Sequence, residues 1–177
     1  MKKKYQFIVL LCFGMLTNSL QVLGQEKANS AKEIVTKHGL GAGAGFTTGY
    51  GLSYRYTPNK WGAQINFAPY KDSETERYSV GLSFLYTLIQ NNNTSLFAYQ
   101  GNHYYYNSQM QYVSNPIAPF NETYKRVSEG YMNNGIGFGI EIIFAKRISF
   151  NLMAGFATYR NFSNINLTGE TALFYKF

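Results

Sequence analysis

The sequence predicts an all-β fold: an eight-stranded antiparallel up-and-down transmembrane β-barrel, preceded by a cleavable signal peptide. Apolar and polar residues alternate with period two from about His38 to Phe177, which is the period of a β-strand. Aromatic residues make up 18% of the chain and charged residues only 14%, against ~25% charged residues in ordinary soluble domains. No apolar run reaches the roughly 18 residues that a membrane helix requires. Strands, and not helices, are therefore expected to cross the membrane.

The N-terminus has the three parts of a secretory signal peptide. Lysines at positions 2–4 precede the apolar stretch 7–16, and Gly24 offers a small residue for cleavage ahead of Gln25. An anchoring helix is the less favoured interpretation, because the apolar stretch is too short to span a bilayer. The expected organisation is a signal peptide over 1–24, a short periplasmic N-terminal tail over 25–37 and the barrel over 38–177.

Composition excludes several classes of function. The only cysteine, Cys12, lies within the apolar part of the signal and not at its cleavage site, so neither a lipoprotein nor a disulfide framework is expected. Removal of the three N-terminal lysines lowers the net charge from +7 to +4, which gives little support to nucleic-acid binding in an exported protein. His38 and His103 have no partners at metal-ligand spacing. No metal and no cofactor is expected.

Eight segments carry the alternation, and the links between them alternate in length. Tight links follow the second, fourth and sixth segments, while longer polar links follow the third and fifth. Short turns on one side and longer loops on the other are typical of outer-membrane barrels. We therefore expect one long extracellular loop over 107–128. The segments are approximately 38–47, 50–57, 61–70, 77–89, 95–106, 129–144, 147–160 and 165–177.

Alternation alone does not say which face of the sheet points outward. One face carries bulky apolar residues such as Leu52, Phe84 and Ile140, and the other carries glycine, serine and amides with few charges. A lipocalin-like soluble barrel would turn the apolar face inward, but eight strands enclose an interior only just wide enough for side chains. We therefore expect the apolar face to contact lipid. Aromatic residues at strand ends, including Tyr50 and Tyr131, should mark the membrane interface.

The last segment, ending in TGETALFYKF, must pair with the first, because hydrocarbon leaves no strand edge unpaired. The last segment, the number of strands and the asymmetry of the links are together typical of one family. The chain resembles the small eight-stranded outer-membrane β-barrel family of the OmpA/OmpX type, in a Bacteroidota-like form. The resemblance covers the whole chain after the signal. It implies a Gram-negative outer-membrane location, contact with lipid and lipopolysaccharide, a monomer, and recognition of Leu173, Tyr175 and Phe177 by the barrel-assembly machinery.

Four charged residues fall on the lumen face. Arg55 and Lys176 are expected to pair there with Glu141 and Glu170. An unpaired charge would be costly in such an interior, so we interpret the four as an ion-pair network that plugs the lumen. A narrow pore is the alternative.

The expected function is that of a structural or surface-binding scaffold. The loop 107–128 would offer a binding surface to an unknown partner through Tyr112, Phe120, Tyr124, Lys125 and Arg126. The alternative is a barrel enzyme acting on lipid A or phospholipid, in which His103 would work with Ser108 and Glu129. We do not expect an enzyme, because Tyr105 stands where such enzymes carry a serine two residues from the histidine.

Overall fold

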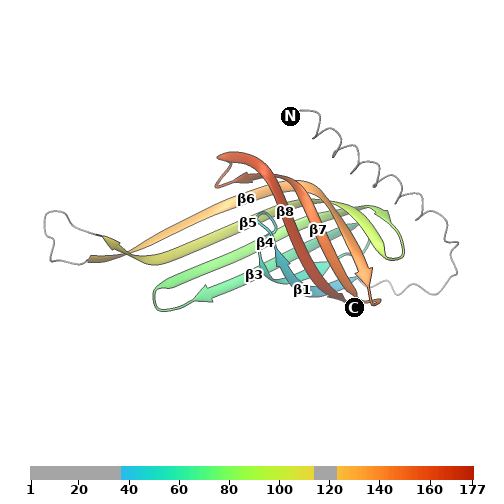
Figure 1. Ribbon diagram of the computed structural model, residues 1–177, viewed down its shortest axis with the longest axis horizontal. Coiled ribbons are helices and arrows are strands. Elements are labelled where there is room, and N and C mark those ends of the chain that lie inside the picture. The colour runs from blue at the N-terminus through green and yellow to red at the C-terminus, as the bar shows by residue number, and fades with distance from the viewer. Residues whose placement is uncertain (1–36, 114–122) are drawn as a thin grey trace, which may run out of the picture. The chain divides into compact units, whose positions relative to one another are not determined.

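Eight antiparallel strands close into a barrel in which each strand lies beside its neighbours in the chain (Figure 1). The computed structural model describes residues 37–113 and 123–177, so the predicted signal peptide and residues 25–36 lie outside the described part. Within that part, no helix is long and apolar enough to cross a membrane. The strands are β1 His38–Ala44, β2 Gly51–Tyr56, β3 Trp61–Lys71, β4 Thr75–Gln90, β5 Thr94–Val113, β6 Thr123–Phe144, β7 Ile148–Tyr159 and β8 Asn164–Lys176. The predicted fold class and strand number are confirmed.

Pairing between β1 and β8 closes the barrel. The register runs from Gly39 opposite Lys176 to Ala44 opposite Thr171. Beyond it, the amide of Phe177 donates to the carbonyl of His38 at 2.9 Å, and the amide of His38 donates back at 3.2 Å. Every strand from β1 to β8 thus has a partner on both sides, as a sheet surrounded by hydrocarbon requires.

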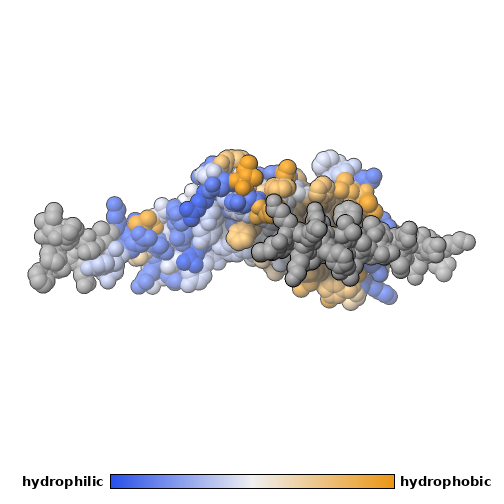
Figure 2. Space-filling model, turned by 45° about the horizontal axis from the view of Figure 1, so that its top comes forward, coloured by the Kyte–Doolittle hydropathy of each residue, from blue (hydrophilic) through white to orange (hydrophobic). Residues whose placement is uncertain are grey.

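The apolar face of the sheet points outward, as predicted. Leu52 and Leu152 are exposed on the outside of β2 and β7, whereas Ser53, Asn66 and Asn151 are buried inside. Figure 2 shows hydrophobic residues gathered over the body of the barrel. A closed sheet with a polar interior and an apolar exterior is a transmembrane β-barrel.

The links at the outer end are shorter than the sequence suggests, because the strands continue further. β5 and β6 stay paired without interruption up to Val113 opposite Thr123. The expected loop 107–128 is therefore mostly a two-stranded hairpin, and residues 114–122 lie outside the described part. Pro116 and Pro119, which cannot donate to a strand ladder, come after the paired residues. This hairpin extends beyond the other strands (Figure 1).

If the exterior faces lipid, a charge added in the middle of a strand should lower the free energy of unfolding more than the same charge added at the end of a strand. Leu152, in the middle of β7, is 54% exposed, and Ile165, at the outer end of β8, is 72% exposed. Leu152→Arg should lower the free energy of unfolding in lipid vesicles by about 2–4 kcal/mol, since the charge lies near the centre of the bilayer. Ile165→Arg should cost at most about 1 kcal/mol, because water reaches the interface. Urea titration of refolded barrels measures both. Equal costs would contradict a lipid-facing exterior.

Candidate functional site

The link between β1 and β2, residues 45–50, turns into the lumen; we call it the inward link. Thr47 and Thr48 at its centre are 0% and 1% exposed. Lumen-facing glycines make room for its backbone. A Cβ on Gly81 would lie 1.7 Å from the carbonyl oxygen of Thr48, and one on Gly101 would lie 2.7 Å from that of Thr47. No side chain could occupy either position without moving the link.

Glu170 holds the inward link from β8, the strand that pairs with β1. Its carboxylate accepts hydrogen bonds from the hydroxyl of Thr47 and, at 3.0 Å, from the backbone N–H of Thr48. The hydroxyl of Tyr99 donates to the same carboxylate at 3.4 Å. Hydrogen bonds to an ionised carboxylate are stronger than neutral ones. The link is therefore fastened to the barrel wall and does not merely rest in the lumen.

Three of the four predicted lumen charges come together near the periplasmic end. The Nζ of Lys176 donates to Glu141 at 3.0 Å, and an Nη of Arg55 lies 3.7 Å from the other oxygen of Glu141. The guanidinium of Arg55 also lies over the rings of Phe174 and Phe97, 4.5 and 5.4 Å from their centroids. These aromatic partners were not predicted.

Glu170 does not join this ion-pair network. It lies six residues before Lys176 on β8, a separation of roughly 20 Å along a strand. No lysine or arginine among residues 37–113 and 123–177 forms a salt bridge with it. Its negative charge is matched instead by the donors of the inward link.

Amide side chains connect the ion-pair network with the inward link. Arg55 donates twice to the amide oxygen of Gln64, at 2.6 and 3.0 Å. Gln64 donates to Asn66 at 3.0 Å, and Asn66 donates to the carbonyls of Thr48 and Gly49 at 2.9 and 3.0 Å. A buried apolar cluster lies beside this chain and consists of Leu85, Phe97, Tyr99 and Met153. Polar and apolar side chains are therefore both buried in the interior.

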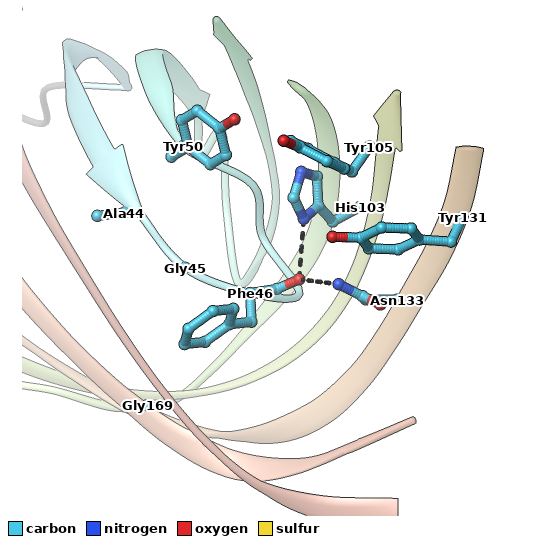
Figure 3. A pocket seen from close by; sticks show the side chains of 9 residues that line it. All are labelled: Ala44, Gly45, Phe46, Tyr50, His103, Tyr105, Tyr131, Asn133 and Gly169. Carbon is cyan, nitrogen blue, oxygen red and sulfur yellow. Dashed lines mark hydrogen bonds between the residues drawn. The ribbon is translucent and has the colours of Figure 1, made fainter. Parts of the chain in front are cut away.

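A pocket of about 380 Å³ opens at the outer mouth of the barrel, over the inward link (Figure 3). Its floor is fixed by the carbonyl of Phe46, which bonds to Nδ1 of His103 at 2.9 Å and accepts from the Asn133 amide at 3.0 Å. Tyr50 and Tyr131, expected in the interfacial girdle, line this pocket instead. The lining residues are Ala44, Gly45, Phe46, Tyr50, His103, Tyr105, Tyr131, Asn133 and Gly169.

Both ring nitrogens of His103 have hydrogen-bond partners within the barrel. Since a carbonyl only accepts, its Nδ1 donates to Phe46 and its Nε2 accepts from the hydroxyl of Ser79, 2.9 Å away. Ser79 is 0% exposed, so a substrate could not reach that hydroxyl. Ser108, the serine that the enzyme alternative requires, instead accepts from Ser128 at 2.9 Å.

Glu129, the third residue of that alternative, pairs in register with Asn107 on β5. In the described part of the chain, no three His, Cys, Asp or Glu side chains come together in a group that could hold a metal ion. The histidine, serine and carboxylate of the enzyme alternative are not brought together, because His103 pairs with Asn133, four and five positions along the ladder from Asn107–Glu129 and Ser108–Ser128.

The predicted binding residues lie on the projecting hairpin. Tyr112 and Tyr124 are exposed and face each other across its two strands, with ring centroids 6.0 Å apart. Lys125 and Arg126 are exposed on β6. Phe120 lies outside the described residues.

The three residues predicted as an assembly signal lie at the periplasmic end of the barrel. Leu173 and Tyr175 are exposed on the outer face of β8, and Phe177 is exposed just after it. Their recognition by an assembly machinery stays a prediction.

No family model matches the sequence, and no curated protein matches it. Among solved structures, the chain is similar to the N-terminal β-barrel domain of OprF from Pseudomonas aeruginosa, at 11% identity and a TM-score of 0.48 over 79% of this chain and 95% of that one. It is also similar to the Neisserial surface protein A, at 14% identity and a TM-score of 0.41 over 79% and 93%. Ail, the attachment invasion locus protein of Yersinia pestis, is similar at 16% identity and a TM-score of 0.43 over 79% and 95%.

These TM-scores are low, so the kind of barrel follows from this chain's own strand pairing and from its apolar exterior. The closed ring of eight strands, the apolar exterior and the projecting outer hairpin are those of an outer-membrane barrel. The chain is an eight-stranded outer-membrane β-barrel.

Glu141 is the single acid of the ion-pair network, so its removal should strongly lower the free energy of unfolding. Glu141→Ala leaves Arg55 and Lys176 without their buried counter-charge, which should cost about 3–5 kcal/mol of unfolding free energy. The matched control is Lys71→Ala, which breaks the exposed Lys71–Glu76 pair and should cost at most about 1 kcal/mol. Urea midpoints of barrels refolded in detergent would compare the two. A similar, small loss in both variants would show that Glu141 is not needed to balance the lumen.

Proposed function

We propose that this protein is a closed scaffold in the outer membrane that presents a surface for binding, and that it works neither as a pore nor as an enzyme. The observation that carries the proposal is the filled lumen, where the inward link, the amide chain and the Arg55–Glu141–Lys176 network follow one another. A barrel with such an interior has no evident path for solutes. Its use to the cell would then lie in the parts that leave the membrane.

The projecting hairpin is the largest such part. The strand ladder continues above the Ser108–Ser128 pair to Val113 and Thr123, and this pairing would lower the entropy lost on binding. Exposed aromatic and basic groups give it a mixed surface through Met110, Tyr112, Tyr124, Lys125 and Arg126. Aromatic residues and arginine are the side chains that most often dominate protein interfaces. We infer an unidentified surface partner for this hairpin.

The remaining partners follow from the location. Lipid and lipopolysaccharide would surround the exterior, and the barrel-assembly machinery would insert the chain. A monomer is proposed because the sheet closes on itself and needs no second copy to pair its edges.

If the lumen is filled, the protein should not conduct ions across a membrane. Purified protein in planar bilayers should give no steady conductance levels, because ions would have to cross the layers between the inward link and Lys176. Glu170→Ala, which removes the carboxylate that holds Thr47 and Thr48, should also stay silent, since the layers below the inward link are still filled. Steady channel levels from the unaltered protein would contradict the closed scaffold and favour the pore.

If the projecting hairpin is the binding surface, its removal should abolish binding of the partner. Residues 109–127 can be replaced by a short Gly/Ser turn directly above the paired Ser108 and Ser128, which leaves the rest of the ladder in register. The variant should fold but lose co-purification of its surface partner. The matched control replaces 72–74, the link between β3 and β4, in the same way and should retain it. Electrophoretic mobility of unheated samples would report folding.

The enzyme alternative is tested in the same experiment. His103→Ala should leave the mass profile of lipid A and of phospholipids unchanged. A changed lipid profile in His103→Ala, with unchanged partners in the hairpin variant, would overturn the scaffold in favour of the enzyme.

A further inference from the structure

We propose that the pocket at the outer mouth binds a neutral, hydroxyl-rich ring of the size of a single sugar unit. At about 380 Å³, the pocket falls in the range of small-molecule sites, which is roughly 300–1,000 Å³. Its nine lining residues include no lysine, arginine, aspartate or glutamate. The site would belong to the barrel itself and is separate from the projecting hairpin.

The polar groups that the pocket offers to a ligand are three tyrosine hydroxyls. Those of Tyr50, Tyr105 and Tyr131 point toward the middle of the pocket (Figure 3), and no hydrogen bond joins them to another of the residues drawn there. The other polar side chains of the lining already have hydrogen-bond partners within the barrel. His103 bonds to Ser79 and Phe46, and Asn133 bonds to the Phe46 carbonyl and to the amide of Arg160.

A hydroxyl both donates and accepts hydrogen bonds, so three converging tyrosines match a ligand whose own groups do the same. An anionic ligand would require a cation in the lining, and no lining residue supplies one. The guanidinium of Arg160 lies over the Tyr131 ring, 5.7 Å from its centroid, but Arg160 is not one of the nine lining residues. A cationic ligand would require open aromatic faces. The rings of Tyr105 and Tyr131 instead lie against each other, with centroids 5.1 Å apart, and Tyr50 meets His103 edge-on at 77°.

The apolar part of the lining suits the C–H face of a sugar ring. Ala44, Gly45 and Phe46 form one side of the pocket. The Phe46 carbonyl is fixed by two hydrogen bonds from the barrel wall, and the amide of Tyr50 donates to the Ser79 hydroxyl at 3.3 Å. The site is therefore formed before a ligand arrives, which lowers the entropic cost of binding.

The test uses the protein in lipid nanodiscs and saturation-transfer NMR with the methyl pyranosides of glucose, galactose and mannose, and with phenol as a single-hydroxyl aromatic probe. At least one pyranoside should bind. Tyr105→Phe combined with Tyr131→Phe should weaken that binding about tenfold, since two neutral hydrogen bonds are lost while both rings remain. The matched control, Tyr104→Phe, removes a hydroxyl from the outer face of β5 and should bind as the unaltered protein does.

Three results would overturn the proposal: no pyranoside bound by the unaltered protein, equal affinity in the folded double variant, or preferential binding of phenol. The variant with the shortened hairpin should keep pyranoside binding. The shortened hairpin leaves the pocket intact, and the double tyrosine variant leaves the hairpin intact. The two variants therefore test the pocket proposal and the scaffold proposal separately.

Discussion

Closure of the sheet between β1 and β8 is the constraint on which the rest of the structure depends. In hydrocarbon, no water can bond to an unpaired N–H or C=O group, so a strand edge cannot remain open. Closing eight strands fixes a narrow interior and turns one face of every strand toward lipid. The apolar half of the alternation must then lie outside. The polar half is forced into a space that has neither lipid nor bulk water.

That space must satisfy its own polar groups, since burial of an unpaired polar group or charge is costly. Glu141 lies between two cations, and amide side chains carry the hydrogen bonds from Arg55 up to the inward link. β1 and β2 have only seven and six residues, against 11 in β3. The inward link occupies the lumen above these short strands. Its backbone carbonyls accept from Asn66, and its donors meet Glu170.

Period-two alternation predicted the strands, because successive side chains of a strand point to opposite faces of the sheet. The composition of the two faces and the narrow interior of eight strands then predicted which face points outward. Opposite charges near the same ends also placed Arg55, Glu141 and Lys176 together. The inward link could not be predicted, because FTTGY reads equally well as a short outer turn. Its only signal was indirect: glycines at lumen positions such as Gly81 and Gly101, which make room for backbone. The length of β5 and β6 was missed because polar residues in a hairpin outside the membrane no longer alternate with apolar ones.

The inward link contributes both to the filling of the lumen and to the lining of the pocket. The inward link places Thr47 and Thr48 in the lumen, while its flanking residues supply the Phe46 floor and the Tyr50 wall of the pocket. His103 and Asn133 fix the Phe46 carbonyl between the two. Eight strands enclose an interior only just wide enough for side chains, and here buried side chains occupy the lumen below the inward link, so the pocket lies at the mouth. A link that folds inward thus occupies the lumen and, by the same geometry, leaves a lined hollow that faces outward.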